Sequence, residues 1–77
     1  MKMQYSDIEE VAVETMNNGQ GYGSGYDACY GQINKTWYAA VWHVATQKTI
    51  GVIDCDDEEQ AARIAHSMAC GNSEYFD

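Results

Sequence analysis

The side chains with the clearest chemical potential form an acidic run at residues 54–59. Five of these six positions are carboxylates: Asp54, Asp56, Asp57, Glu58 and Glu59. An EF-hand loop would need oxygen ligands at alternating positions, a glycine at the sixth and a glutamate at the twelfth. Counted from Asp54, the sixth residue is Glu59 and the next glycine is Gly71. The run does not match a calcium loop, and we expect no dedicated metal site.

The other reactive side chains form no recognisable site. No two of the histidines and cysteines show a zinc-ligand spacing such as C-x₂-C or H-x₃-H, and nothing orients a cysteine against a histidine as a nucleophile; these residues are His43, His66, Cys29, Cys55 and Cys70. The glycine-rich stretch 19–25 lacks the G-x-x-x-x-G-K pattern of a phosphate-binding loop and is expected to be a flexible loop. We predict that the chain is not an enzyme and has no catalytic residue, cofactor or metal.

The net charge restricts the partners. Twelve acidic residues against four basic ones give a formal charge of −8 over 77 residues. Nucleic acids and anionic membranes are bound largely through lysine and arginine, so both are excluded as direct partners. The longest apolar stretch, residues 37–45, is too short to span a bilayer, and the N-terminus lacks the pattern of a signal peptide. The three cysteines are odd in number and form no paired motif, so we expect them to be reduced thiols in a cytoplasm.

A chain of this length is expected to form a single domain over residues 1–77. A first helix is predicted behind a capping box of Ser6 and Glu9, because a run of apolar residues follows one helical face and Asn17 to Gly19 can end it; the face comprises Ile8, Val11, Ala12, Thr15 and Met16. Residues 26–33, 36–46 and 49–55 are rich in β-branched and aromatic side chains and predict three strands. Both faces of the middle strand are largely apolar, so the sequence does not determine which face is buried.

A second helix is predicted directly after the third strand. Asp56 is its expected cap, Glu59 occupies the third helical position, and Gly71 ends it. Its buried stripe is expected to comprise Ala61, Ile64, Ala65, Met68 and Ala69. The predicted fold class is therefore α+β, a three-stranded antiparallel sheet with two helices in the order α-β-β-β-α.

This order of elements resembles the double-stranded RNA-binding domain in topology and length. Those domains place a lysine-rich segment at the start of the second helix, where it holds phosphates. The corresponding residues here, 56–59, are all acidic. The resemblance thus implies an arrangement of elements, and the ligand does not carry over.

The acidic run has dimensions similar to those of a nucleic acid backbone. Asp54 to Asp56 spans about 6.6 Å in a strand and Asp56 to Glu59 about 4.5 Å in a helix. The sum of about 11 Å is close to three phosphate intervals of about 3.4 Å. Such carboxylates can occupy a groove of lysine and arginine in place of phosphates. Further acids lack basic neighbours in sequence, and three of them on the first predicted helix form a candidate second patch: Glu9, Glu10 and Glu14.

In size, acidity, absence of proline and richness in tyrosine and tryptophan, the chain resembles phage-encoded anti-CRISPR proteins, a group without a common motif. The resemblance implies a viral inhibitor that evades host defence in the host bacterial cytoplasm. Its partner would be a CRISPR effector subunit that binds DNA, whose basic surface it would block by acidic mimicry. The alternative is an acidic antitoxin or small regulatory protein that neutralises one cognate partner. The sequence leaves the target and the oligomeric state open.

Overall fold

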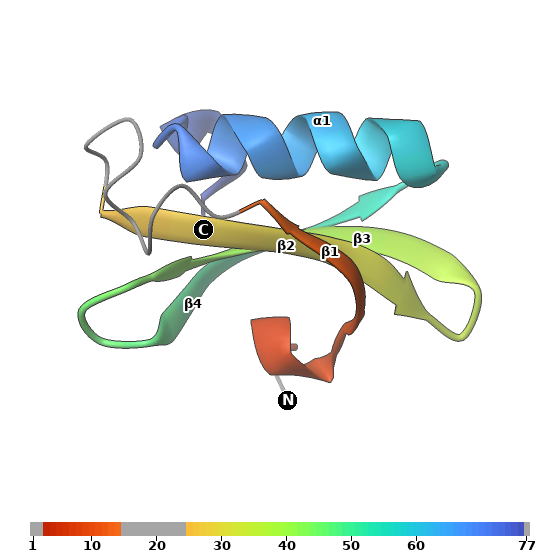
Figure 1. The fold of residues 1–77 in the computed structure, drawn as a ribbon, viewed down its shortest axis with the longest axis horizontal. Coiled ribbons are helices and arrows are strands. Elements are labelled where there is room, and N and C mark those ends of the chain that lie inside the picture. The colour runs from red at the N-terminus through yellow and green to blue at the C-terminus, as the bar shows by residue number, and fades with distance from the viewer. Residues whose placement is uncertain (1–2, 15–24, 77) are drawn as a thin grey trace.

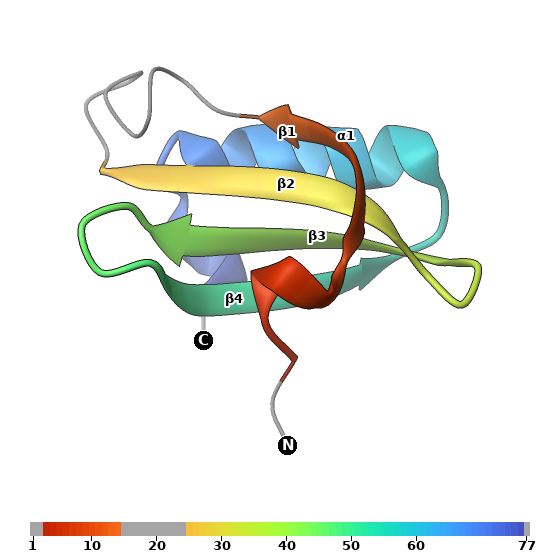
Figure 2. The same cartoon turned by 60° about the horizontal axis from the view of Figure 1, so that its bottom comes forward.

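The computed structural model describes residues 3–14 and 25–76, which form a four-stranded antiparallel sheet with one α-helix on one of its faces (Figure 1). The strands lie side by side in chain order (Figure 2). They are β1 (Glu9–Glu14), β2 (Tyr26–Ile33), β3 (Thr36–His43) and β4 (Lys48–Cys55), followed by α1 (Glu58–Ala69). Short 3-10 helices precede and follow them, η1 (Tyr5–Asp7) and η3 (Ser73–Tyr75).

The prediction of an α+β fold with an antiparallel sheet is confirmed. The three predicted strands form β2, β3 and β4, and β3, with Trp42, pairs with both of the others. The turn between β2 and β3 uses Asn34 and Lys35 at φ values of 50° and 72°. A left-handed pair of this kind suits the twist of a two-residue hairpin. β3 is shorter than predicted, because it ends at His43.

The prediction of a helix in the N-terminal segment is wrong where the structure describes it. Glu9–Glu14 forms β1, which pairs antiparallel with β2, with an irregularity between Glu10 and Ala12. Val11 and Val13 alternate in this segment, and β-branched residues favour a strand once a neighbouring strand edge can pair with them. The observed order of strands and helix, β-β-β-β-α, therefore departs from the double-stranded RNA-binding domain.

The proposed capping box of Ser6 and Glu9 is also absent, because Ser6 lies within the 3-10 helix η1 and Glu9 begins β1, so neither residue caps an α-helix. Its place is taken by a tighter turn, in which the Asp7 carboxylate accepts a hydrogen bond from the Gln4 backbone N–H at 2.8 Å. The predicted helix end at residues 17–19 and most of the glycine-rich stretch 19–25 lie outside the described residues.

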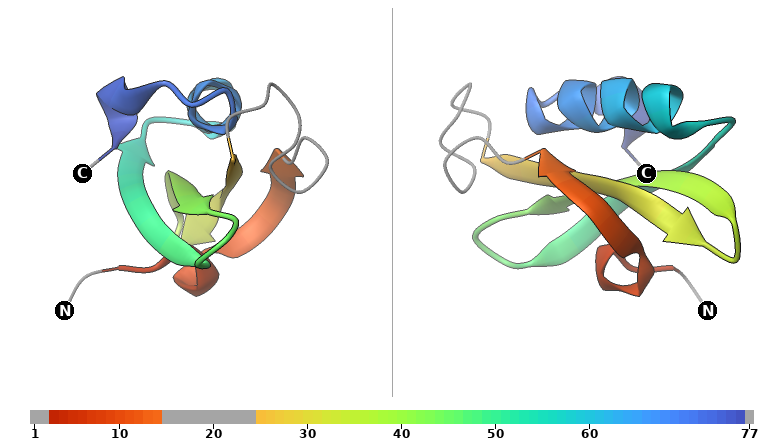
Figure 3. Two further views of the ribbon diagram at one scale, coloured as in Figure 1. Left: turned by 90° about the vertical axis from the view of Figure 1, so that its left-hand side faces the viewer. Right: turned by 45° about the vertical axis from the view of Figure 1, so that its right-hand side comes forward.

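The main core lies between α1 and the sheet, which curves around the helix so that β1 and β4 lie on either side of it (Figure 3). The predicted helical stripe is buried there, except that Ile64 is half-buried. Most of the contact is made by small side chains, which allow the backbones to approach closely. The fully buried members from both layers are Ala28, Ala39, Val41, Ala61, Ala65, Met68 and Ala69.

The opposite face of the sheet carries a smaller cluster that is covered by η1. The Tyr5 ring stacks on Trp42 with a centroid separation of 4.1 Å and an angle of 15° between the planes. The Tyr5 backbone N–H donates to Thr49 Oγ1 at 3.0 Å, and its hydroxyl donates to Gln47 Oε1 at 2.9 Å. Ile8 is buried beside them. Both faces of β3 are thus inside, which explains why both are apolar in sequence.

The main core predicts a large effect for Met68→Ala. The Met68 side chain is fully buried between α1 and the sheet, so its truncation should lower the free energy of unfolding by about 2–5 kcal/mol. Urea unfolding followed by tryptophan fluorescence measures this loss. Ser67→Ala, at the half-buried neighbouring position, is the control and should change stability by less than about 0.5 kcal/mol. Similar stabilities for the two variants would contradict the packing described here.

Candidate protein interface

The acidic residues 54–59 lie where the end of β4 leads into α1 (Figure 1). We call this surface the acidic corner and define it by Asp54, Asp56, Asp57, Glu58 and Glu59. All five residues are exposed. Asp54 stands opposite Tyr38 in the β3–β4 pairing, and only two residues separate β4 from α1. This short connection places acids from a strand and from a helix on one end of the molecule.

Hydrogen bonds at the start of α1 correct the predicted cap by one residue. The N-cap is Asp57, not Asp56, and Asp57 Oδ1 accepts from the Gln60 backbone N–H at 2.8 Å. Gln60 therefore occupies the third helical position in place of Glu59. Its Oε1 accepts from the Asp56 backbone N–H at 2.6 Å. Helix capping thus uses one carboxylate of the acidic corner.

Among the described residues, the other four carboxylates have no counter-charge. Within residues 3–14 and 25–76, they accept no hydrogen bond and form no ion pair within 4 Å; they are Asp54, Asp56, Glu58 and Glu59. The positive end of the α1 dipole offsets part of their mutual repulsion, since acids are favourable in the first turn of a helix. The rest of that repulsion remains in the free protein. A cationic partner would relieve it.

The acidic corner changes the chemistry of the cysteine within it. The pKa of the Cys55 thiol is raised from its ordinary value, first by burial and then by the negative charge of Asp54, with smaller contributions from Asp56 and Asp57. A backbone hydrogen bond from Ala39 acts in the opposite direction. The thiol is therefore held in its neutral form and is a weak nucleophile.

The described part of the chain contains no group of three or more histidine, cysteine, aspartate or glutamate side chains that could hold a metal ion. The carboxylates of the acidic corner follow the end of a strand and the start of a helix, and they do not converge on one point. This arrangement suits contacts with several separate cations. The prediction that the chain binds no metal stays a prediction.

The candidate second patch does not join the acidic corner. Glu9, Glu10 and Glu14 lie on β1, at the opposite edge of the sheet from β4, and not on a helix. The register places Glu9 in one row with Gln32, Trp37 and Cys55, so the Glu9 backbone is about 14 Å from the corner, or three strand spacings. β1 runs from there toward the other end of the sheet. Only the first residues of β1 lie at the same end of the sheet as the acidic corner.

The remaining candidate residues are dispersed. Cys29 and Cys55 are buried and Cys70 is exposed, and none of the three forms a disulfide. His43 lies at the end of β3, where its ring meets Tyr26 edge to face at 5.5 Å, whereas His66 lies on α1. The structure therefore brings no pair of them together as a site. No helix formed by the described residues is long and apolar enough to cross a membrane.

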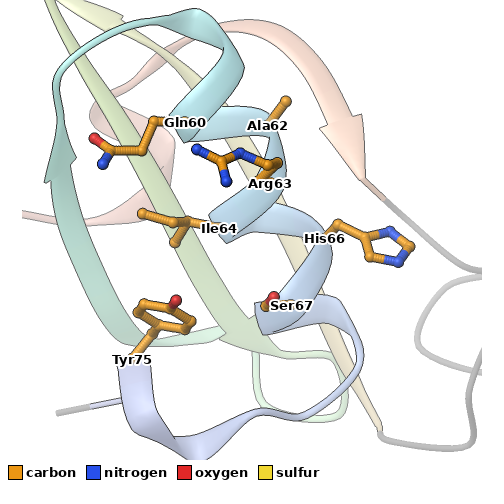
Figure 4. A pocket seen from close by; sticks show the side chains of 7 residues that line it. All are labelled: Gln60, Ala62, Arg63, Ile64, His66, Ser67 and Tyr75. Carbon is orange, nitrogen blue, oxygen red and sulfur yellow. The ribbon is translucent and has the colours of Figure 1, made fainter.

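Two features were missed by the sequence analysis. One is Asp27, which the sequence identified only as one of the twelve acids. It is 6% exposed, and its Oδ1 has no hydrogen-bond partner among the described residues. A groove on the outer side of α1 involves Tyr75 of η3 (Figure 4). The position of Tyr75 depends on tertiary contacts of the tail, which no local sequence pattern indicates.

Comparisons with known proteins add no family assignment: no family model, no curated protein and no solved structure matches this chain.

The raised pKa of Cys55 predicts how stability responds to alkaline pH. A thiol whose folded-state pKa exceeds its ordinary value of 9.0 contributes stability that is complete below that value and is lost as the pH rises through the folded pKa. The stability of the wild type relative to Cys55→Ala should therefore be constant up to about pH 8 and fall above about pH 9. Urea unfolding at a series of pH values measures the difference, in which groups common to both proteins cancel.

Two further results define this test. In the Asp54→Asn background the alkaline loss should be smaller, because the second cause of the raised pKa is removed. A stability difference that does not change with pH would show that Cys55 ionises equally in the folded and unfolded chains.

Proposed function

We propose that this protein is a phage-type inhibitor that binds the basic nucleic-acid-binding surface of a CRISPR effector complex and blocks target DNA binding. The observation that carries the proposal is the acidic corner, with five exposed carboxylates of which one serves as a helix cap. The four others have no cation among the described residues. A surface of this kind favours a partner that supplies the missing positive charge.

The spacing of these acids supports mimicry of a phosphate backbone. Asp54 and Asp56 stand on either side of Cys55, and two residues of extended chain rise by about 6.6 Å, close to two intervals of about 3.4 Å between phosphates on one DNA strand. Asp57 is also extended, with φ −156° and ψ 177°. Arginine side chains can form bidentate contacts to a carboxylate as they do to a phosphate. Several such contacts along the acidic corner would occupy the positions that a nucleic acid needs.

The net charge of the chain supports the same class of partner. A formal charge of −8 on 77 residues attracts a cationic surface over about a Debye length, roughly 8 Å at physiological ionic strength, and accelerates association. The same charge disfavours direct binding to DNA or RNA. The CRISPR effector as target, a viral origin and action in the host bacterial cytoplasm rest on the likeness in size, charge and composition to anti-CRISPR proteins.

The alternative is an acidic antitoxin or small regulatory protein that neutralises one cognate protein. The acidic corner fits that partner equally well if its surface is basic. The two functions differ in what the partner loses: the inhibitor displaces DNA from an effector, whereas the antitoxin need not compete with nucleic acid.

Neutralising the acidic corner should weaken the complex. Asp56→Asn, Asp57→Asn and Glu58→Gln together remove three charges, and asparagine at position 57 keeps the helix cap. With an effector complex that the wild type inhibits, the triple variant should bind more than about tenfold more weakly if each lost pair is worth about 1 kcal/mol. Surface plasmon resonance at two salt concentrations measures the affinity and its salt dependence.

A matched control separates the acidic corner from net charge. Glu9→Gln, Glu10→Gln and Glu14→Gln remove the same three charges from β1. If the acidic corner makes the contacts, this control should lose no more than a few-fold in affinity. Equal losses in both variants would mean that total charge, not the acidic corner, governs binding.

Competition with DNA tests the proposed mechanism directly. The effector complex should not hold this protein and its target DNA together, because both occupy the same cations. Native mass spectrometry or a supershift assay detects a ternary complex if one forms. Such a complex would refute mimicry. The isolated protein should also give no gel shift with DNA or RNA at micromolar concentration and physiological salt.

A further inference from the structure

The outer side of α1 carries a groove that the proposed function does not use. Its volume is about 570 Å³, within the range of about 300–1,000 Å³ typical of small-molecule sites. It lies along the helix, and Tyr75 of η3 lines it below Ile64 in the view of Figure 4. The lining residues are Gln60, Ala62, Arg63, Ile64, His66, Ser67 and Tyr75. None of them is acidic, in a chain with twelve acids.

Arg63 is the polar centre of the groove and the only arginine in the sequence. Its side chain is exposed and extends across the outer surface of α1 toward Gln60 (Figure 4). Glu59, one turn earlier, would be its ordinary ion-pair partner. The structure shows no such pair, and Arg63 makes no hydrogen bond to any of the described residues. Its guanidinium can therefore offer two parallel donors to a carboxylate.

Neutral donors and apolar surface surround this cation. The Gln60 Oε1 is already used by the Asp56 backbone N–H at 2.6 Å, so Gln60 offers its Nε2 group as a donor. Ser67 and Tyr75 add hydroxyl groups. Ile64 and the Tyr75 ring are half-buried and lie on the same side of α1 as Gln60 (Figure 4). An apolar body can rest on these two side chains while a charged group contacts Arg63.

The charge of the whole chain limits the ligand to a single negative charge. A cationic ligand would meet Arg63 and no carboxylate in the lining. A polyanion would gain one arginine and would be repelled by a chain whose net charge, Arg63 included, is −8. We infer that the groove binds a small carboxylate with a flat apolar body. The carboxylate lies on Arg63 and the ring lies against Ile64 and Tyr75.

Nuclear magnetic resonance titration of the full chain tests this site, with naphthoate as the probe. Amide signals of residues 60–67 and of Tyr75 should shift and saturate, with a Kd on the order of 1 mM for a ligand of this size. Naphthamide keeps the ring without the charge, and acetate keeps the charge without the ring. Each should bind at least about tenfold more weakly than naphthoate, and inorganic phosphate should bind no better than acetate.

Two variants locate the carboxylate contact. Arg63→Gln should weaken naphthoate binding at least about tenfold. Lys48→Gln removes the same charge from an exposed position at the start of β4 and should leave the affinity within about twofold. Because both side chains are exposed, both variants should keep the wild-type amide spectrum outside the mutated site.

Several results would overturn the inference. Equal binding of naphthoate and naphthamide, or of the wild type and Arg63→Gln, would remove the role of the carboxylate contact. Shifts confined to the opposite face around Trp42, or shifts that do not saturate, would place the probe elsewhere. Tighter binding of phosphate or of a short acidic peptide than of naphthoate would assign a different ligand. No step requires the effector complex, so the outcome is independent of the proposed function.

Discussion

The close contact between α1 and the sheet determines the positions of the two candidate surfaces, the acidic corner and the groove. The layers meet through alanines, with Ala61 and Ala65 of the helix facing Ala28 and Ala39 of β2 and β3. Because these side chains are so small, the helix and the sheet pack closely, and the segment that connects β4 to α1 cannot pass between them. With only Asp56 and Asp57 between β4 and α1, the chain must reverse at the end of the sheet. The acids of this reversal are therefore held at the rim of the core, in water.

Only part of the acidic corner serves the stability of the fold. Capping of α1 needs one carboxylate, which Asp57 provides, and the helix dipole favours acids in the first turn. Asp54 and Asp56 precede the helix, and their charges repel those of Glu58 and Glu59 without a compensating cation among the described residues. Burial first, and then the charges of Asp54, Asp56 and Asp57, raise the pKa of the Cys55 thiol and favour its neutral form. The proposed function assigns these charges to a contact outside the fold.

Sequence patterns were sufficient wherever a local signal decided the structure. Apolar periodicity identified α1, β-branched and aromatic runs identified β2 to β4, and Asn34–Lys35 marked their first turn. For the segment 9–14, Glu-Glu-Val-Ala-Val-Glu fits a helical face and a strand about equally well. The choice there depends on the free edge of β2, with which β1 pairs through an irregular register. That is a tertiary interaction, and no local pattern reports it.

Prediction of the candidate sites was limited in the same way, because local patterns do not report backbone geometry or tertiary contacts. The exposure of the acidic corner follows from charge, since five adjacent carboxylates cannot be buried without partners. Which aspartate caps the helix depends on backbone geometry, and consecutive aspartates give no basis for choosing between 56 and 57. The groove could not be predicted, because Tyr75 reaches it only when the tail packs over Gly51. An ideal Cβ at position 51 would lie 2.5 Å from the Tyr75 carbonyl oxygen.

The two candidate surfaces lie on the same helix and differ in physical character. Gln60 connects them: its backbone N–H donates to Asp57 Oδ1, its Oε1 accepts from the Asp56 backbone N–H, and its side chain also lines the groove. Contacts at the exposed acidic corner would be long-range and strongly screened by salt. A ligand in the groove would be held partly by apolar burial on Ile64 and Tyr75, which salt does not screen. Ionic strength therefore separates apolar from charged contact: a complex that survives high salt draws on apolar burial, and one that salt dissociates draws on charge, at the acidic corner or at Arg63.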